Sequence, residues 1–220
     1  MKILITGTSN GIGLNTAKYF LDKGHIVIGF DLEESKINDS NYTHYVLDIK
    51  DKKNLPELKD IDVIFNNAGK QNSDNDIENN LIGTINVTEK YLSLPSLKSI
   101  LFNASASARS GFEFPYYVAS KAGVVGYMKN VASRLAKRNI TVNSISLGGV
   151  YTKSNDCVIN DKESFTKIMS ATPLKKWASE EEVSEWVYFL TMVNKSMSGQ
   201  DILIDNGEYN LNNTFVWPNK

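Results

Sequence analysis

A tyrosine and a lysine four positions apart are the residues best suited to proton transfer in this 220-residue chain. Tyr117 and Lys121 fall in a segment whose pattern predicts a helix over 116–138, and their spacing places both side chains on one helix face. A lysine cation beside a phenol favours the phenolate and lowers the tyrosine pKa toward neutrality. The pair could therefore exchange a proton with a reacting oxygen, although a bare Tyr-x-x-x-Lys pattern is common by chance. Tyr116, the competing phenol, is five positions from Lys121 and falls off that face.

A glycine-rich stretch, Thr6-Gly7-Thr8-Ser9-Asn10-Gly11-Ile12-Gly13, lies where the first predicted strand ends and the first predicted helix begins. Glycines at such a turn let backbone N–H groups approach a pyrophosphate, which the helix N-terminus then stabilises. A glycine-rich turn that binds no ligand is the alternative interpretation. The residues of this stretch predicted to bind a dinucleotide are Gly7, Ser9, Asn10, Gly11, Ile12 and Gly13.

An acidic residue is placed to select the form of that dinucleotide. Asp31 follows the next predicted strand, about 20 residues along, where a carboxylate accepts hydrogen bonds from ribose hydroxyls. A lone Asp at a strand end is otherwise a turn former. No Arg or Lys stands at positions 8–10 or 32 to hold a 2′-phosphate, so the sequence predicts NAD(H) rather than NADP(H) as cofactor.

The elements that must position these residues follow from the apolar pattern. Short runs rich in Ile and Val predict strands at 3–5, 26–30, 44–47, 63–65, 100–102, 141–145 and 201–204. Longer periodic segments predict helices at 13–22, 77–92, 116–138 and 180–193. Helix-length connections imply right-handed parallel crossovers, so the predicted fold class is α/β, a Rossmann-type doubly wound parallel sheet in three α/β/α layers. One domain is expected over 1–220, with 32–42 mostly loop and 151–172 a lid or substrate loop.

Composition narrows the class of protein. A formal charge of −1 provides no basic field for nucleic acid or an anionic membrane, and neither partner is expected. Cys157 is the only cysteine, which suits a reducing compartment, and the apolar run at the N-terminus is too short for a signal peptide or a span. A cytoplasmic protein is therefore expected. His25 and His44 are isolated, so no metal site is predicted.

The motifs together resemble the short-chain dehydrogenase/reductase family, in its compact single-domain branch. The spacing Gly7-x-x-x-Gly11-x-Gly13 is similar to that family's own, and Tyr117-x-x-x-Lys121 resembles its catalytic signature. Asn66-Asn67-Ala68-Gly69 resembles the segment that steadies the sheet and lines the adenosine. Asp48-Ile49 resembles the adenine contact, and the stretch 146–152 resembles the one over the nicotinamide. The resemblance spans nearly the whole chain in the right order.

The resemblance implies an NAD(H)-dependent oxidoreductase that transfers hydride between nicotinamide and a carbonyl/alcohol substrate. Its implied catalytic residues are Tyr117 as acid/base, Lys121, Ser105 as substrate hydrogen-bond donor, and Asn80, whose backbone would hold a water of a proton relay. Ser107 is the alternative serine, because the usual Ser-Ser pair is interrupted. Further cofactor contacts are implied for Asp48, Ile49, Asn67, Ala68, Gly69, Tyr117, Lys121, Gly148, Val150 and Thr152.

Three departures from the family pattern bear on function. Only ten residues separate Gly69 from Asn80, Leu147 replaces a typical proline, and the serine segment is altered. The alternatives are a 3-oxoacyl-thioester reductase of fatty-acid synthesis and a regulator that senses NAD without turnover.

The expected partners are a small-molecule carbonyl/alcohol substrate and further copies of the chain, as a homodimer or homotetramer. The assembly is implied by the resemblance and by apolar residues around Val124, Val125 and Met128. The tail 208–220, with Phe215 and Trp217, is expected to dock on the body or on another subunit.

Overall fold

Seven parallel strands form one sheet in the computed structural model, which describes residues 1–112 and 114–211. The strand order is β3-β2-β1-β4-β5-β6-β7, and every neighbouring pair is parallel. The strands are β1 Lys2–Thr6, β2 Ile26–Asp31, β3 Tyr42–Val46, β4 Val63–Asn66, β5 Ser99–Asn103, β6 Thr141–Leu147 and β7 Asp201–Ile204. The order reverses between β1 and β4, which is the point where open α/β sheets bind ligands. All seven predicted strands and the doubly wound Rossmann-type sheet are confirmed.

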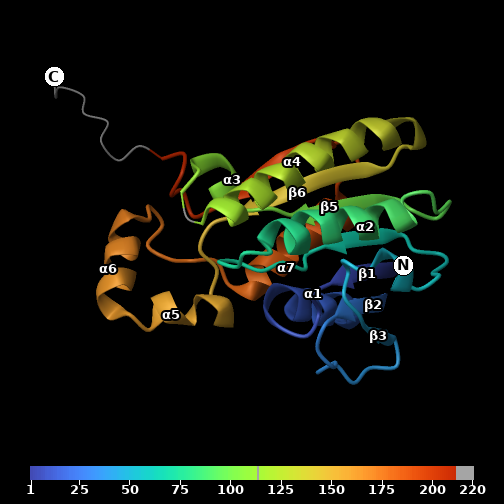
Figure 1. The fold of residues 1–220 in the computed structure, drawn as a ribbon, viewed down its shortest axis with the longest axis horizontal. Coiled ribbons are helices and arrows are strands. Elements are labelled where there is room, and N and C mark those ends of the chain that lie inside the picture. Colours follow the sequence, from blue (N-terminus) through green and yellow to red (C-terminus); the bar gives the residue numbers. More distant parts are fainter. Residues whose placement is uncertain (113, 212–220) are drawn as a thin grey trace.

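Helices cover both faces of this sheet (Figure 1). The α-helices are α1 Gly11–Asp22, α2 Gly83–Tyr91, α3 Ser107–Ser110, α4 Pro115–Leu135, α5 Asp156–Ile159, α6 Lys162–Ala171 and α7 Glu180–Tyr188. Short 3-10 turns lie at Lys52–Asn54, Ala136–Arg138 and Lys153–Asn155, and π-helical turns at Ile77–Ile82 and Phe189–Val193. The four predicted helices are confirmed, two of them with a π-helical end.

Alternation along the strands divides the core into two layers. Ile3 and Ile5 of β1 pack with α1 and α7, whereas Leu4 faces α2 and α4 on the other side. Val124 and Met128 of α4 lie in that second layer and are fully or almost fully buried within the chain itself. Their side chains are therefore not available for a subunit interface, whereas Val125 is only partly buried. The assembly itself stays a prediction.

The prediction that 151–172 is a loop is wrong, because most of this segment forms α5 and α6. Asp161 caps α6 by accepting hydrogen bonds from the backbone N–H groups of Glu163 and Ser164. Local capping thus starts a helix in a stretch whose polar composition suggests none. The two helices stand beside the sheet rather than over one of its faces (Figure 1). The polar segment 32–42 is loop up to the start of β3, as predicted.

The turn that follows β7 makes hydrogen bonds to two earlier segments of the chain. Glu208 accepts a hydrogen bond from Thr172 at the end of α6, and the Tyr209 hydroxyl donates to the carbonyl of Arg109. The expected docking of Phe215 and Trp217 lies outside the described residues. Among the helices of 1–112 and 114–211, none combines the length and the apolar character needed to cross a bilayer.

Candidate active site

The residues predicted to bind cofactor or substrate lie along the edge of the sheet that is formed by the carboxyl ends of its strands. Parallel strands end at the same edge, so the segments that follow them are neighbours in space. The residues concerned are Asp31, the last residue of β2, and those that follow the other strands: Gly7 after β1, Asp48 after β3, Asn67 after β4, Ser105 after β5 and Gly148 after β6. The fold thus assembles into one region a set of residues spread over most of the chain.

The glycine-rich turn fits a pyrophosphate. Gly7 and Gly11 have φ values of 77° and 58°, in the left-handed region that favours glycine. A Cβ on Gly13 would overlap the carbonyl oxygen of Gly7, so the turn closes only with glycine there. Asn10 precedes α1 without capping it through its side chain, which leaves the first N–H groups of that helix for an anion.

The segments expected at the adenosine combine two carboxylates and one cation. Asp31 accepts hydrogen bonds from the backbone N–H groups of Ser9, at 2.9 Å, and Glu33, at 3.0 Å. The Asn10 side chain donates to the Glu33 carboxylate and accepts from the Lys36 ammonium. The 32–42 loop thus brings the Lys36 ammonium against the glycine-rich turn, a cation that the lack of Arg and Lys at positions 8–10 and 32 does not reveal.

Two other segments expected at the adenosine are held in place by their own side chains. The Asn67 side chain donates to the carbonyl of Thr6 at 3.0 Å and accepts from Asn103 at 3.0 Å, which fixes the end of β4 to its neighbours. Ile49 turns its side chain into the core, where a Cβ on Gly83 would come within 2.7 Å of it. Only the backbone of Ile49 is therefore left to face a ligand.

Lys121 is a buried cation beside Tyr117. Its Nζ donates to the carbonyl of Asn103 at 2.8 Å and lies 5.7 Å from the centre of the Tyr117 ring. Burial lowers the pKa of Lys121 to about 8, and the negative charge of Asp76 acts in the opposite sense. The ammonium is therefore the main form at neutral pH. Tyr117 is half-buried, whereas Tyr116 is 53% exposed.

Asn80 lies in the π-helical turn that precedes α2. Its side chain exchanges two hydrogen bonds with the backbone of Lys70 and donates to the Ser120 hydroxyl at 2.9 Å. A Cβ on Gly69 would lie 2.9 Å from the Asn80 amide oxygen and 3.4 Å from the Lys121 Nζ. Glycine at 69 thus lets both side chains approach the same backbone. The sequence pattern gives no signal for Ser120, a buried serine that links Asn80 to α4.

The two candidate serines form one hydrogen-bonded pair. The Ser105 and Ser107 hydroxyls lie 2.9 Å apart, and the backbone N–H of Ser107 donates to the Ser105 oxygen at 3.2 Å. The segment between them is held along β6, because Ala106 N–H donates to the carbonyl of Leu147 at 2.8 Å. Both hydroxyls are buried, so their position depends on the packing of the short helix α3.

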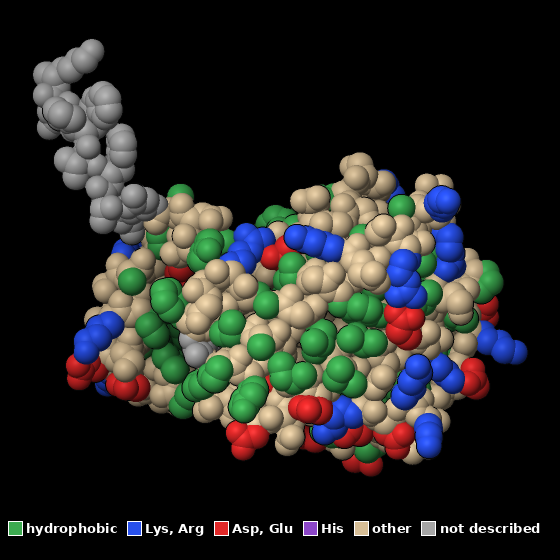
Figure 2. All heavy atoms as spheres, turned by 45° about the horizontal axis from the view of Figure 1, so that its top comes forward, with side chains coloured by type: hydrophobic (Ala, Val, Ile, Leu, Met, Phe, Trp, Pro, Cys, Tyr) green, Lys and Arg blue, Asp and Glu red, His purple; other side chains and the backbone are tan. Residues whose placement is uncertain are grey.

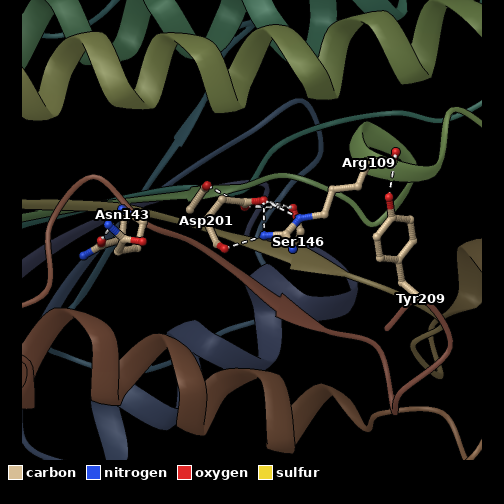
Figure 3. Close-up of polar contacts among 7 residues, drawn as sticks. Arg109, Asn143, Ser146, Asp201 and Tyr209 are labelled. Atoms are coloured by element: carbon tan, nitrogen blue, oxygen red, sulfur yellow. Dashed lines mark hydrogen bonds and ion pairs between the residues drawn. The ribbon is translucent and has the colours of Figure 1, made fainter. Parts of the chain in front are cut away.

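Arg109 holds α3 against β7, the last strand of the sheet (Figure 3). Arg109 of α3 donates from Nε and Nη2 to one oxygen of Asp201, at 2.9 and 2.7 Å. The hydroxyls of Ser144 and Ser146 on β6 donate to the same carboxylate. Asp201 starts β7, and 92 positions separate it from Arg109, so no spacing pattern could have revealed this pair.

The segments expected over the nicotinamide are packed against the C-terminal part of the chain. Gly148 N–H donates to the carbonyl of Ile204, and a Cβ on Gly148 would lie 2.8 Å from that of Asp205. Val150 forms a parallel bridge with Ala178. The Thr152 hydroxyl shares a hydrogen bond of 2.7 Å with Ser154. Within 1–112 and 114–211, no group of three or more His, Cys, Asp or Glu side chains is arranged to hold a metal ion.

The arrangement has close counterparts among known proteins. The family described as "Enoyl-(Acyl carrier protein) reductase" matches residues 7–208. The 3-oxoacyl-[acyl-carrier-protein] reductase FabG of Thermotoga maritima is 28% identical, over 93% of this chain and 96% of its own. Two solved structures, each 26% identical with a TM-score of 0.83, cover 94% of this chain and 98% of their own: 4-hydroxyisoleucine dehydrogenase with NADH, and ElxO with NADP.

The match over 7–208 takes in the glycine-rich turn, the serine segment and the Tyr117–Lys121 helix. The fold, with its seven parallel strands and its strand reversal between β1 and β4, agrees with that assignment. The chain therefore belongs to the short-chain dehydrogenase/reductase family, as an oxidoreductase that interconverts CH–OH and C=O groups.

Proposed function

We propose that this protein is an NAD(H)-dependent oxidoreductase of carbonyl and alcohol substrates, with Tyr117 as its acid/base. One observation carries the proposal: the buried ammonium of Lys121 lies beside the Tyr117 ring at the sheet edge that holds the glycine-rich turn. A phenol next to a buried cation loses its proton more readily than in water. The pair therefore suits proton transfer to an oxygen near neutral pH.

The mechanism follows from the groups that surround the substrate oxygen. The chemistry that bound NADH supplies is a hydride for the carbonyl carbon. As negative charge develops on the carbonyl oxygen, Tyr117 donates its proton there, so that its O–H bond breaks while the alcohol O–H bond forms. Lys121 stabilises the phenolate that remains, and a hydroxyl of the Ser105–Ser107 pair donates a hydrogen bond to the same oxygen. Alcohol oxidation runs these proton transfers in reverse.

Cofactor binding is assigned to the segments at the sheet edge. The glycine-rich turn would hold the pyrophosphate, and Asp31 the adenosine ribose. Two carboxylates, Asp31 and Glu33, outweigh the single ammonium of Lys36 beside the turn, which supports NAD(H) over NADP(H). Of the two similar structures, one holds NADH and the other NADP, so both forms belong in the test.

Apolar side chains next to the catalytic tyrosine support a second candidate, reduction of 3-oxoacyl thioesters. Phe112, Phe114 and Tyr116 are all exposed, with 77% of Phe112 open to solvent. Hydrophobic side chains also gather across the middle of one face of the molecule (Figure 2). An acyl chain would bury such surface. The likeness to 3-oxoacyl-[acyl-carrier-protein] reductases points to the same substrate class.

The lobe formed by α5 and α6 is proposed to cover the substrate. An aromatic cluster joins it to the body: the Phe165 ring lies 5.3 Å from that of Trp177, and both lie about 6 Å from Tyr151. Tyr151 and Trp177 belong to the segments that bridge through Val150 and Ala178. A movement of α6 would therefore displace the segment expected over the nicotinamide.

The protein is also proposed to assemble as a homodimer or homotetramer. Trp186 and Phe189 stack edge to face, and with Val193 they leave an apolar stripe exposed along α7 and the turn that follows it. Their spacing of three and seven positions places them on one helix face. An exposed apolar stripe of this kind is typical of an interface.

The experiment follows NADH consumption against a panel of ketones, aldehydes and a 3-oxoacyl thioester. Tyr117→Phe should lower turnover by about 10²-fold or more, the usual scale for loss of a general acid, with NADH affinity unchanged. Tyr116→Phe is the matched control and should keep normal turnover. Near-normal turnover in Tyr117→Phe would contradict the proposal. Tight NADH binding without turnover of any compound would favour the NAD-sensing regulator instead.

A further inference from the structure

Asn103, the last residue of β5, makes hydrogen bonds in two directions. Its backbone carbonyl accepts from the Nζ of Lys121 at 2.8 Å. Its side-chain Nδ2 donates to the amide oxygen of Asn67 at 3.0 Å. The strand end is held in the sheet, where Asn103 is paired with Ile145 of β6. One residue therefore contacts Lys121 through its backbone and the segment after β4 through its side chain.

Asn67 continues this series to the glycine-rich turn. Its Nδ2 donates to the carbonyl oxygens of Thr6, at 3.0 Å, and Gly7, at 3.3 Å. A Cβ on Gly13 would lie 2.6 Å from the same nitrogen, so the turn closes directly on this amide. Two asparagine side chains thus join the turn to Lys121 by a continuous series of hydrogen bonds.

The series has a fixed direction. Asn67 uses its N–H groups on two carbonyls, so its oxygen faces Asn103, and only a donor at position 103 can bond to it. The amide oxygen of Asn103 is buried and has no hydrogen-bond partner among the described residues. A buried acceptor without a partner is unfavourable, and leucine, which has a similar size, would avoid that cost. The bond to Asn67 is therefore what an asparagine side chain contributes here.

We infer that Asn103 is a positioning residue that couples the glycine-rich turn to the ammonium of Lys121. Hydrogen bonds in series polarise one another, so a pyrophosphate bound at the turn strengthens the bonds from Asn67 and Asn103. The last link is geometric, because the side chain and the carbonyl of Asn103 belong to one residue at the end of a paired strand. Occupation of the turn would thus adjust the cation that lies beside Tyr117. The inference rests on the proposed function, since it needs a dinucleotide in the turn and Lys121 as that cation.

The direct test uses ADP, whose pyrophosphate can occupy the turn but which has no nicotinamide ribose to contact Lys121. NMR of protein labelled at the lysine ε carbon follows the ammonium, and Lys121→Arg assigns the signal. ADP should shift the Lys121 signal in the unchanged protein. Asn103→Leu keeps the volume and removes the donor, so the shift should be lost while the Kd for ADP changes at most severalfold.

Asn143→Leu is the matched control. The Asn143 side chain also makes two hydrogen bonds, donating to the carbonyl of Met197 and accepting from the N–H of Gln200. It is buried on β6, four residues before the end of that strand, and belongs to no part of the series. This variant should lose stability and keep the response of Lys121 to ADP.

A double-mutant cycle without any nucleotide tests the route. Asn67→Ala, which changes the far end of the series, should by itself shift the Lys121 signal. In the Asn103→Leu background the same change should add almost nothing, because the series is already interrupted. Additive shifts would show that Asn67 and Asn103 affect Lys121 independently, which contradicts the coupling.

Turnover gives a readout of its own. Asn103→Leu should lower kcat by about tenfold or more through misplacement of Lys121, with a much smaller change in the KM for NADH. Asn143→Leu should leave kcat unchanged. An equal loss of kcat in both variants would mean that Asn103 has only a structural role.

Two further results would overturn the inference. A Lys121 signal that does not respond to bound ADP in the unchanged protein does so without any variant that must fold. A shift of the same size in Asn103→Leu would assign the response to the charge of the pyrophosphate acting through space. Failure of the proposed function is distinguishable, because it would appear as normal turnover in Tyr117→Phe while Lys121 still responded to ADP.

Discussion

Arg109 and Asp201 join the serine segment to the edge strand of the sheet through two hydrogen bonds to one carboxylate oxygen (Figure 3). α3 has only four residues, too few to be stable alone, so its position depends on such contacts. Ser144 and Ser146 hold the carboxylate in place by donating to it. The pair therefore holds the Ser105 and Ser107 hydroxyls in place relative to β6.

Arg109→Ala should loosen this segment and slow catalysis. The free energy of unfolding should fall by about 1–3 kcal/mol, because Asp201 loses its charged partner. A small misplacement of the serines should lower kcat by about tenfold or more while the Kd for NADH stays constant. Amide hydrogen exchange should rise selectively over 104–111. The measurements are steady-state kinetics, fluorescence titration and exchange by mass spectrometry.

Arg134→Ala is the matched control for that change. Arg134 also makes a two-pronged ion pair, with Glu89, but on α4 nearer its C-terminal end. It should cost stability without a change in kcat. If Arg109→Ala and Arg134→Ala affected kcat equally, the Arg109–Asp201 pair would have no special role in catalysis.

Cofactor choice should depend on Asp31 and Lys36 in opposite directions. Asp31→Ala removes the charge that repels a 2′-phosphate and should narrow the difference between the Kd values for NADH and NADPH. Lys36→Ala removes the cation beside Asn10 and should weaken NADPH binding more than NADH binding. Fluorescence titration with both cofactors measures these effects. Equal or tighter binding of NADPH by the unchanged protein would refute the NAD(H) proposal.

The negative charge of the Glu180 carboxylate should weaken cofactor binding. This first residue of α7 reaches the glycine-rich turn, where its carboxylate would lie 3.8 Å from a Cβ on Gly11. A pyrophosphate held there would be repelled by the ionised side chain. Glu180→Gln should therefore tighten NADH binding severalfold. Glu181→Gln, an exposed neighbour in the same acidic turn, should have little effect.

The pH dependence of that effect has a definite sign. Burial raises the pKa of Glu180, so the folded protein takes up this proton more readily than the unfolded chain. As pH falls through the raised pKa, the repelling charge disappears and NADH affinity should rise. Calorimetric titration at several pH values should show this rise in the unchanged protein and its loss in Glu180→Gln. The same pH dependence in both proteins would exclude Glu180 as its source.

Assembly should depend on the apolar stripe of α7. Trp186→Glu combined with Phe189→Glu places two charges on that exposed face and should convert the oligomer to a monomer of about the chain mass. Val125→Glu on α4 tests the other helix considered for the interface. Light scattering reports the mass of each variant. A monomer in the unchanged protein would refute the proposed assembly.

The sequence by itself determined the seven strands, their parallel direction and the α/β fold class. Strands and long helices follow from periods of two and 3.6 residues, which are local properties of the chain. The glycine-rich turn and the Tyr117–Lys121 pair could also be predicted, because their members are close in sequence and the strand order brings them to one edge.

Only the tertiary structure decided which distant charges meet. Lys36 reaches Asn10 across a loop, and Arg109 binds Asp201 from 92 positions away. The energy of such contacts depends on distance through space and on burial, and neither quantity has a periodic signature along the chain. The spacing pattern could therefore point to Tyr117 and Lys121, but not to the charged residues that the fold brings together from distant parts of the chain.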